Sequence, residues 1–586
     1  MARTDPHSFR DDNQPDIEHV DWRAAIDFRS QTIAANVTLR LARPSEGGPL
    51  DLDTRDLAIE EVHEGEGRAL AWDKSEPVAI LGARLRIELP AGTRVVTIRY
   101  RTSPAASALQ WLAPAQTAGG VSPFLFSQCQ AIHARSIVPL QDTPAVRVRY
   151  RAELVVPKGL RALMAAAHVS RDVRAESAVE TWEMPQPIPP YLLALAVGDL
   201  ASRDVGPRSR VWAEPSIVER AAWEFDGVDH MLKVAESLFG PYDWERFDVL
   251  TMPPSFPYGG MENPRLTFLT PTLLAGDRSL VSVVAHELAH SWTGNLVSNA
   301  NAEHFWLNEG FTVFAERRIV EALEGKERAA LDAALGRRAL DGAVKRFIDG
   351  GHPELTRLRP SLEGVDPDDA FSIVPYEKGF LLLRALEEAA GREAFDAFLR
   401  EYIARFRFRA ITSDDFLALL EEKLPDAAHK VDPRAWLDGE GVPDSAPAPR
   451  SERLDTIAKI GNALPDRAAA NAWAPMEWQL YLEALPRPSP EIVKSLDETY
   501  RLTASTNYEV LVTWLELALR SGHAPAKARV TEVLAAVGRM KYLRPLYRAL
   551  VETDPESAKS TYAACKAGYH PIARQIVEGV LKGSVG

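Results

Sequence analysis

The sequence predicts a multidomain α+β protein made of an all-β part, a mixed part with long helices, and an all-helical part. Three observations predict this fold class. The chain has 586 residues, whereas a single hydrophobic core serves roughly 250 to 300. Alternating apolar and polar residues dominate its first third, and helical periodicity dominates its C-terminal part. Between them, residues 439–452 concentrate Pro, Ser and Ala without periodicity, as interdomain linkers do.

The N-terminal region, residues 1–202, is expected to be an all-β domain similar to a β-sandwich. From about residue 21 onward, segments such as RVVTIRYRT and VRVRYRAELVVP alternate apolar and polar side chains, a pattern typical of half-buried strands. Pro and Gly turns separate these segments. We therefore expect strands to dominate this region.

The middle region, residues 203–440, is expected to be mixed. The segments FDVLTM and RLTFLT are predicted strands, and long helices are predicted from residue 279 to about residue 437. We place a linker at residues 441–452. Residues 453–586 contain successive amphipathic helices of about 12 to 18 residues with Gly or Pro at their ends, which indicates a helical-repeat domain.

The composition argues against several classes of function. A formal charge of -14 does not suit a general nucleic-acid binder, which needs clustered Lys and Arg. With only Cys129 and Cys565 in the chain, a disulfide framework is not expected and a zinc site must use His and carboxylate ligands. No apolar run approaches the roughly 18 residues of a membrane span, and the first residues have no apolar signal core. We expect a cytoplasmic monomer without a membrane partner.

The stretch SLVSVVAHELAHSWTGN contains the pattern HExxH. Residues four apart on a helix differ by only about 40° in direction, so His286 and His290 can point at one metal ion. Zinc lowers the pKa of a bound water to about 7, and Glu287 is placed to accept the proton of that water. The pattern is therefore typical of zinc hydrolases, although it also arises by chance in about one chain in fifty of this composition.

A third ligand candidate follows at the spacing that such a site needs. Glu309 lies eighteen residues after His290 in HFWLNEGFTVFAERR, and this requirement lowers the chance expectation roughly tenfold. Two His and one Glu leave one position of a zinc ion open, which marks a catalytic site. We therefore expect one Zn²⁺ per chain. Glu316 shares a face with Glu309 and either orients a ligand imidazole or is a surface carboxylate.

Two further segments carry candidate site residues. In FPYGGMENPRL, Gly259 and Gly260 permit close approach of a peptide backbone or simply make a turn. Glu262 is placed to bind the ammonium group of a substrate, which would make the enzyme an exopeptidase. In GVDPDDAFSIVPYEKGF, Asp368 precedes a helix and Tyr376 lies at its start. Tyr376 either donates a hydrogen bond to an oxyanion or is a buried tyrosine with another partner.

HELAH, the spacing to Glu309, GGMEN and VPYEKGF occur in one order, and together they resemble the M1 zinc aminopeptidases. LFSQCQAIHARSIVPLQDTP, PPSFPYGGMENPRLTFLTPTLLAGDRSL and VGRMKYLRPLYRAL are similar to the leukotriene A(4) hydrolase and aminopeptidase B-like branch of that family. The resemblance covers the chain from about residue 21 to its end. It implies a β domain, a thermolysin-like catalytic domain and a C-terminal helical domain of the HEAT or armadillo kind, around a cavity.

The resemblance also implies roles for single residues. His286, His290 and Glu309 correspond to the zinc ligands, Glu287 to the general base and Tyr376 to the transition-state stabiliser. Glu262 and Gln130 correspond to the residues that recognise the free amino end, and Asp368 to the carboxylate used in peptide binding and in placing a water that attacks an epoxide. The remaining substrate-binding positions are Gln128, Tyr258, Gly259, Gly260, Met261, Arg539 and Lys541.

Arg539 and Lys541 correspond to the cationic pair that receives a substrate carboxylate. Gly538 is predicted to follow a helix end and Pro545 to lie early in the next helix, so we expect the pair on an interhelical loop. Solvated surface charges are the alternative. Phe371 replaces the tyrosine that lipid-processing members have five residues before Tyr376, which removes a hydroxyl from the epoxide side of the pocket.

The predicted function is that of a zinc aminopeptidase that removes N-terminal residues from short peptides, tripeptides included. An epoxide hydrolase that acts on fatty-acid epoxides at the same zinc site, alone or as a second activity, is the alternative. A scaffold with a vestigial metal site and an endopeptidase are further hypotheses. The complete set of ligands, base and tyrosine argues against a scaffold.

Overall fold

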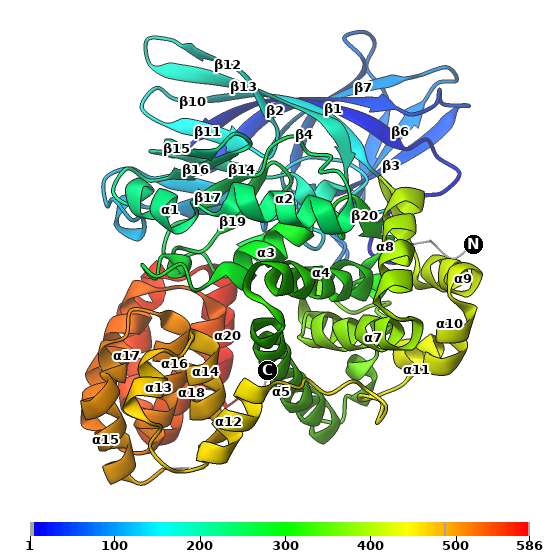
Figure 1. Ribbon diagram of the computed structural model, residues 1–586. Coiled ribbons are helices and arrows are strands. Elements are labelled where there is room, and N and C mark those ends of the chain that lie inside the picture. Colours follow the sequence, from blue (N-terminus) through cyan, green and yellow to red (C-terminus); the bar gives the residue numbers. More distant parts are fainter. Residues whose placement is uncertain (1–4, 486–487, 584–586) are drawn as a thin grey trace.

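The computed structural model describes residues 5–485 and 488–583, and it has the predicted three-part α+β architecture. In Figure 1 the N-terminal sheets, in blue and cyan, cover one side of the central helices, in green. The C-terminal helices, in orange and red, lie beside α5 (Lys326–Asp349). Within the described part of the chain, every helix is too short or too polar to span a lipid bilayer.

The largest N-terminal sheet has seven strands and one buried face. In β1 (Ile17–Asp27) the side chains of Trp22, Ala24 and Ile26 are buried while those between them are exposed, which is the alternation of a sheet with one apolar face. β1 pairs in parallel with β10, whereas β2 on the other side of β1 and β13 on the other side of β10 are antiparallel to them. The strand order is β12 (Ala167–Val173), β13 (Ser177–Ile188), β10 (Val148–Pro157), β1, β2 (Thr32–Leu41), β7 (Val95–Arg101) and β4 (Ala58–Glu64).

Two smaller sheets complete the N-terminal region. One consists of β3 (Gly48–Thr54), β6 (Ala83–Leu89) and β5 (Trp72–Lys74). The other consists of β11 (Arg161–Met164), β14 (Leu195–Gly198), β9 (Phe124–Ser127) and β8 (Leu109–Leu112). Gln128 and Gln130 follow β9 directly. Two candidate site residues of the N-terminal region therefore lie just after the end of the buried strand β9.

The central region begins with a five-stranded sheet in the order β15 (Ala201–Gly206), β16 (Ser209–Ala213), β17 (Asp248–Thr251), β19 (Leu266–Leu269) and β18 (Gly260–Met261). The predicted strands FDVLTM and RLTFLT are β17 and β19. β15 starts two residues before position 203, where the middle region was placed. Because β18 is at the edge of the sheet, the backbone of Gly260 is available to pair with another chain.

Helices follow the sheet and carry most of the candidate site. They are α1 (Val218–Glu224), α2 (Val228–Phe239), α3 (Val281–Ala289), α4 (Trp306–Glu324), α5, α6 (Pro367–Ala370), α7 (Val374–Ala390), α8 (Arg392–Phe406), α9 (Ser413–Lys423), α10 (Pro425–Val431) and α11 (Pro433–Asp438). The short strands β20 (Val297–Asn299) and β21 (Arg409–Ile411) pair within this block.

A pair of glycines brings α4 and α7 together. A Cβ atom at Gly310 would lie 2.7 Å from the Cα atom of Gly379, and the reverse distance is the same. Only glycine fits at so close a helix crossing. Glu309 precedes Gly310 directly, and Tyr376 lies one turn before Gly379, so this crossing brings both residues to one place.

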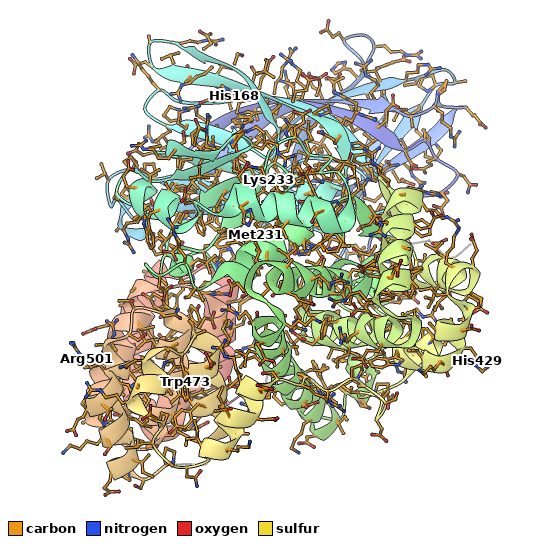
Figure 2. All side chains as sticks on the ribbon, in the orientation of Figure 1. His168, Met231, Lys233, His429, Trp473 and Arg501 are labelled. Atoms are coloured by element: carbon orange, nitrogen blue, oxygen red, sulfur yellow. The ribbon has the colours of Figure 1, made fainter. Side chains whose placement is uncertain are left out.

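The C-terminal helices have a hydrophobic core of their own, to which Leu331 of α5 also belongs. Trp473, labelled in Figure 2, packs edge-on against Trp478 with ring centroids 4.9 Å apart. No regular element lies between α11 and the first of these helices. They are α12 (Glu452–Ile460), α13 (Arg467–Asn471), α14 (Pro475–Ala484), α15 (Pro490–Tyr500), α16 (Tyr508–Arg520), α17 (Ala524–Ala536), α18 (Met540–Thr553), α19 (Pro555–Cys565) and α20 (Pro571–Leu581).

Candidate metal centre and peptide site

Three donor atoms converge from α3, from the residue that caps its C-terminal end, and from α4. Nε2 of His286 lies 3.2 Å from Nε2 of His290. Oε2 of Glu309 lies 3.4 Å from the first of these atoms and 3.6 Å from the second. His290 and Glu309 are buried, and His286 is partly exposed. The structure thus brings together the three residues that the sequence analysis proposed as ligands.

The spacing of these atoms fits a tetrahedral zinc ion. With metal–ligand distances of about 2.0 to 2.2 Å, two ligands of a tetrahedral ion are about 3.3 to 3.6 Å apart. Oε2 of Glu309 is buried and has no hydrogen-bond partner among the described residues, although an unpaired buried carboxylate oxygen is costly. Because a cation between the three atoms removes this cost, the residues present fit the metal that the sequence predicts.

The outer nitrogens of both imidazoles are held in place. Nδ1 of His286 lies 3.0 Å from Oε2 of Glu316, and Nδ1 of His290 lies 3.2 Å from the carbonyl oxygen of Thr293. Both acceptors require a proton on Nδ1, which leaves the lone pair of Nε2 for a metal. Of the two interpretations of Glu316, the geometry favours the one in which it orients a ligand imidazole.

Glu287 belongs to α3, and its carboxylate lies against Gly260 in the edge strand β18. A Cβ atom at Gly260 would lie 2.2 Å from Oε1 of Glu287, so the carboxylate occupies the space that the glycine leaves free. Burial raises the pKa of Glu287 to about 8, and the charge of His286 lowers it. Because Glu262, Glu309 and Glu316 also surround this point, the site attracts cations.

Tyr376 stands at the start of α7 beside the predicted ligands. Its ring is nearly parallel to that of His286, with centroids 6.1 Å apart. Burial and the charges of Glu309 and Glu262 raise the pKa of Tyr376 well above 10. The phenol therefore keeps its proton and remains a hydrogen-bond donor at neutral pH.

Glu262 and Gln130 meet although 132 positions separate them: Nε2 of Gln130 donates to Oε1 of Glu262 at 3.2 Å. Asn295 fixes the backbone by donating to the carbonyl of Glu262 at 2.7 Å. Sequence reasoning missed Asn308 and Tyr191; the side-chain amide of Asn308 donates to the Tyr191 hydroxyl at 3.2 Å. Burial raises the pKa of the Glu262 carboxyl, and hydrogen bonds from these two residues lower it. Asn308 could have been found from the sequence, because it directly precedes the predicted ligand Glu309. No sequence pattern points to Tyr191.

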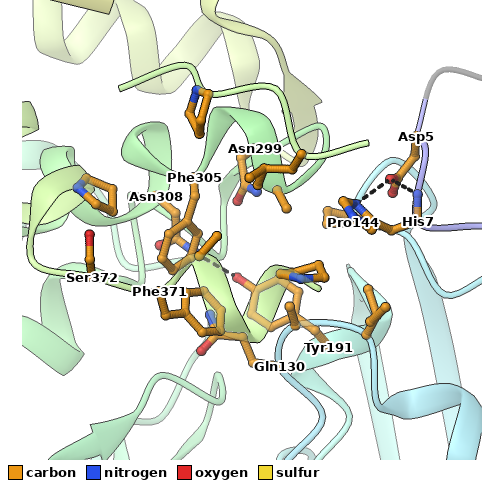
Figure 3. Close-up of a pocket in the computed structure, with 18 of the residues that line it drawn as sticks. Asp5, His7, Gln130, Pro144, Tyr191, Asn299, Phe305, Asn308, Phe371 and Ser372 are labelled. Atoms are coloured by element: carbon orange, nitrogen blue, oxygen red, sulfur yellow. Dashed lines mark hydrogen bonds and ion pairs between the residues drawn. The ribbon is translucent and has the colours of Figure 1, made fainter. Parts of the chain in front are cut away.

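A mostly apolar cavity of about 60 Å³ begins at Gln130. Figure 3 shows Phe305 and Phe371 on one side of it and Tyr191 on the other. The rings of Phe305 and Phe371 are in contact, with centroids 4.9 Å apart. A water needs about 10 to 15 Å³ by this measure, so the cavity has room for about four to six waters or for an aliphatic side chain.

Asp368 lies in the short helix α6 and is held by a residue that sequence reasoning missed. Its Oδ2 lies 2.7 Å from Nε2 of His133, and Nδ1 of the same imidazole lies 2.8 Å from the hydroxyl of Ser107. Tyr258 is half-buried. Burial and the charge of Asp368 raise the pKa of its hydroxyl, and a hydrogen bond with Gln128 lowers it. Met261 is buried in β18.

The structure corrects the expectation that Arg539 and Lys541 share an interhelical loop. α18 begins at Met540, because the carbonyl of Arg539 already accepts from the backbone of Tyr542 and Leu543. Arg539 is therefore the N-cap, Lys541 lies in the first turn, and Pro545 lies inside the helix. Both side chains nevertheless converge on Glu509: Nη1 of Arg539 at 3.3 Å and Nζ of Lys541 at 2.7 Å.

The fold and the site define a metallopeptidase, and comparison with known families identifies its kind. The peptidase family M1 domain matches residues 223–434, the peptidase M1 N-terminal domain matches residues 16–192, and the C-terminal domain of leukotriene A4 hydrolase matches residues 473–581. The chain belongs to the M1 peptidase family, and the predicted family is confirmed.

Relatives extend the match over the whole chain. Leukotriene A-4 hydrolase of Xenopus laevis is 40% identical, with 98% of both chains covered. Leucine aminopeptidase 2 of Yarrowia lipolytica is 39% identical and covers 94% of this chain and 89% of its own. The native leukotriene A4 hydrolase structure from Saccharomyces cerevisiae superposes with a TM-score of 0.87 at 33% identity, covering 99% of this chain and 98% of its own. The predicted three-domain fold class is confirmed by these matches.

Proposed function

We propose that the protein is a zinc aminopeptidase that removes the N-terminal residue from short peptides, with one zinc ion bound by His286, His290 and Glu309. One observation carries the proposal. A carboxylate oxygen of Glu262, one of Glu287 and a ring nitrogen of His290 lie within 4.8 Å of one another. An ammonium group bound by Glu262 therefore places the first peptide bond beside the metal ligands and the base.

Glu262 and Gln130 recognise the amino end of the substrate. The Glu262 carboxylate is buried, and an ion pair in such surroundings is much stronger than in water. Gln130 orients it and offers its own amide oxygen to the ammonium group. Because the Glu262 carboxylate takes a free ammonium group as its partner, the substrate must offer its amino end here, and the enzyme is an exopeptidase.

A zinc ion in this site supplies Lewis acidity, which polarises the carbonyl group and lowers the pKa of water. Glu287 accepts the proton of the attacking water and passes it to the leaving amine. Tyr376 donates a hydrogen bond to the oxyanion that develops at the carbonyl. Glu316 and the Thr293 carbonyl keep the two imidazoles in their orientation throughout.

The two ends of the site set the length and type of the peptide. The cavity beside Gln130 takes the side chain of the first residue, and its size and apolar lining favour an aliphatic side chain. The backbone of the peptide pairs with the edge strand at Gly259 and Gly260. Arg539 and Lys541 receive the C-terminal carboxylate of a short peptide.

The test replaces Glu287 by Gln, which keeps the size of the side chain but removes the base. We expect the kcat for leucyl nitroanilide and for a tripeptide to fall by at least about 100-fold, while the zinc content stays at one per chain. Glu324→Gln, on the outer end of α4, is the matched control and keeps the wild-type rate. A wild-type rate in Glu287→Gln contradicts the assignment of the base.

Epoxide hydrolysis at the same site is the second candidate activity, because the relatives include leukotriene A-4 hydrolase and Asp368 is held by His133 at the site. Phe371 offers no hydroxyl at this wall of the cavity. We expect slow diol formation from a fatty-acid epoxide beside rapid peptide hydrolysis. Rapid diol formation without hydrolysis of aminoacyl nitroanilides would reverse this ranking.

A further inference from the structure

A buried carboxylate lies between the two cations proposed to receive the peptide carboxylate. Glu509 of α16 is 7% exposed. Its Oε2 accepts from Nζ of Lys541 at 2.7 Å and from Nε2 of Gln479 at 3.3 Å. Its Oε1 accepts from the hydroxyl of Tyr542 at 2.9 Å and from Nη1 of Arg539 at 3.3 Å. The cationic pair therefore has a counter-ion that belongs to the protein.

Arg539 uses one end of its guanidinium group for contacts inside the protein, and the other end carries an unpaired donor. Nη1 donates to Tyr542 at 2.6 Å, to Thr272 at 3.3 Å and to Glu509. Nε is buried and has no partner among the described residues, and a Cβ atom at Gly259 would lie 2.8 Å from Nη2. Nε and Nη2 form the edge that can bind a carboxylate with two parallel hydrogen bonds, and Nη2 lies beside Gly259, directly before β18.

Glu509 is negatively charged at neutral pH. Burial works to raise the pKa of its carboxyl, but Lys541 and Arg539 outweigh it and lower the pKa to about 2. The receptor for the peptide carboxylate therefore carries two positive charges and one negative charge. A carboxylate bound at the Nε–Nη2 edge would lie on the opposite side of Arg539 from Glu509, where the two like charges would repel.

We propose that Glu509 is a specificity-determining residue whose negative charge limits how tightly the site holds the C-terminal carboxylate of a short peptide. The proposal rests on the proposed aminopeptidase function. A tripeptide and its dipeptide product carry the same carboxylate, so affinity at this point is shared by substrate and product and does not raise kcat. By weakening it, Glu509 lets the dipeptide leave and keeps the site open for the next substrate.

The test compares a tripeptide acid with the matching tripeptide amide in the same variant, so that the ratio of the two KM values reports on the carboxylate alone. Glu509→Gln keeps the size of the side chain and one of its two acceptor oxygens but removes its charge. Across one guanidinium, over about 8 Å, a unit charge changes binding on the order of ten- to thirtyfold at an effective dielectric constant of about 20. We expect the acid-to-amide KM ratio to fall about tenfold and a competing dipeptide to inhibit more tightly.

Glu509→Asp is the matched control, because it shortens the side chain but keeps the charge, and its KM ratio should stay near that of the wild type. An unchanged or higher ratio in Glu509→Gln would overturn the proposal. Tyr542→Phe removes the hydroxyl between Arg539 and Glu509 without a change of charge. If this variant lowers the ratio as much as Glu509→Gln does, hydrogen bonding and not charge sets the affinity, and the proposal is wrong.

Lys541→Met, alone and combined with Glu509→Gln, tests the same charge balance in a way that does not need the Glu509→Gln single variant to fold. Lys541→Met removes one cation, and we expect the KM ratio to rise about tenfold. Adding Glu509→Gln to it restores the net charge of the receptor, and the ratio should return toward the wild-type value; a further rise contradicts the proposal. Failure of the wild-type enzyme to cleave any aminoacyl nitroanilide refutes the proposed function itself, which separates the two hypotheses.

Discussion

Gly260→Ala adds one methyl group beside Glu287 and so tests where the proposed base must lie. A Cβ atom there would lie 2.2 Å from Oε1, 2.4 Å from Cδ and 2.7 Å from Cγ of Glu287. Ordinary contact begins at about 3.4 Å, so the carboxylate must move by about 1.2 Å. Glu287 is 6% exposed and has little room to do so. A misplacement of about 1 Å costs on the order of 100-fold in rate, or about 2.7 kcal/mol of activation free energy.

We therefore expect kcat to fall about 100-fold in Gly260→Ala, with zinc content and thermal unfolding near those of the wild type. The adjacent variant Gly259→Ala is the control, because its Cβ atom would meet Arg539 Nη2 at 2.8 Å and not Glu287. It should raise the KM of tripeptide acids and leave kcat within about threefold. Steady-state kinetics with a tripeptide acid separates the two effects. A kcat within threefold of the wild type in Gly260→Ala would refute the reasoning.

Two further predictions follow from the groups around the site. Glu316→Ala removes the acceptor of His286 Nδ1 and should weaken zinc binding 10- to 100-fold, as measured by competition with a chelator; an unchanged dissociation constant would contradict the orienting role. The pKa of Glu509 is lowered from 4.5 to about 2 on folding, so its stabilising contribution is present above pH 4.5 and is lost as the pH falls toward 2. By pH 3 this loss is about 2 kcal/mol, and denaturant unfolding should show it in the wild type but not in Glu509→Gln.

Much of the site was predictable because its geometry is local. The separation of His286 and His290 by one helical turn depends only on helix periodicity, and β17 and β19 coincide with apolar runs of the expected length. The family followed from motif order and is confirmed. The loop assigned to Lys541 was wrong, because helix ends depend on which backbone groups find partners, and the carbonyl of Arg539 accepts the first hydrogen bonds of α18.

Only the tertiary structure decided which distant residues meet. Gln130 and Glu262 were linked beforehand only by the family resemblance. The pair of His133 and Asp368 is one that no local pattern indicates, because long-range contacts depend on how whole domains pack. The same holds for Glu509, which is one of many glutamates in an amphipathic helix until α16 and α18 place it between Arg539 and Lys541. The sequence by itself determined the type of chemistry, since residue types and helical spacing define donor atoms. The tertiary structure decided the charge balance around Arg539 and Lys541, since this depends on distances across the fold.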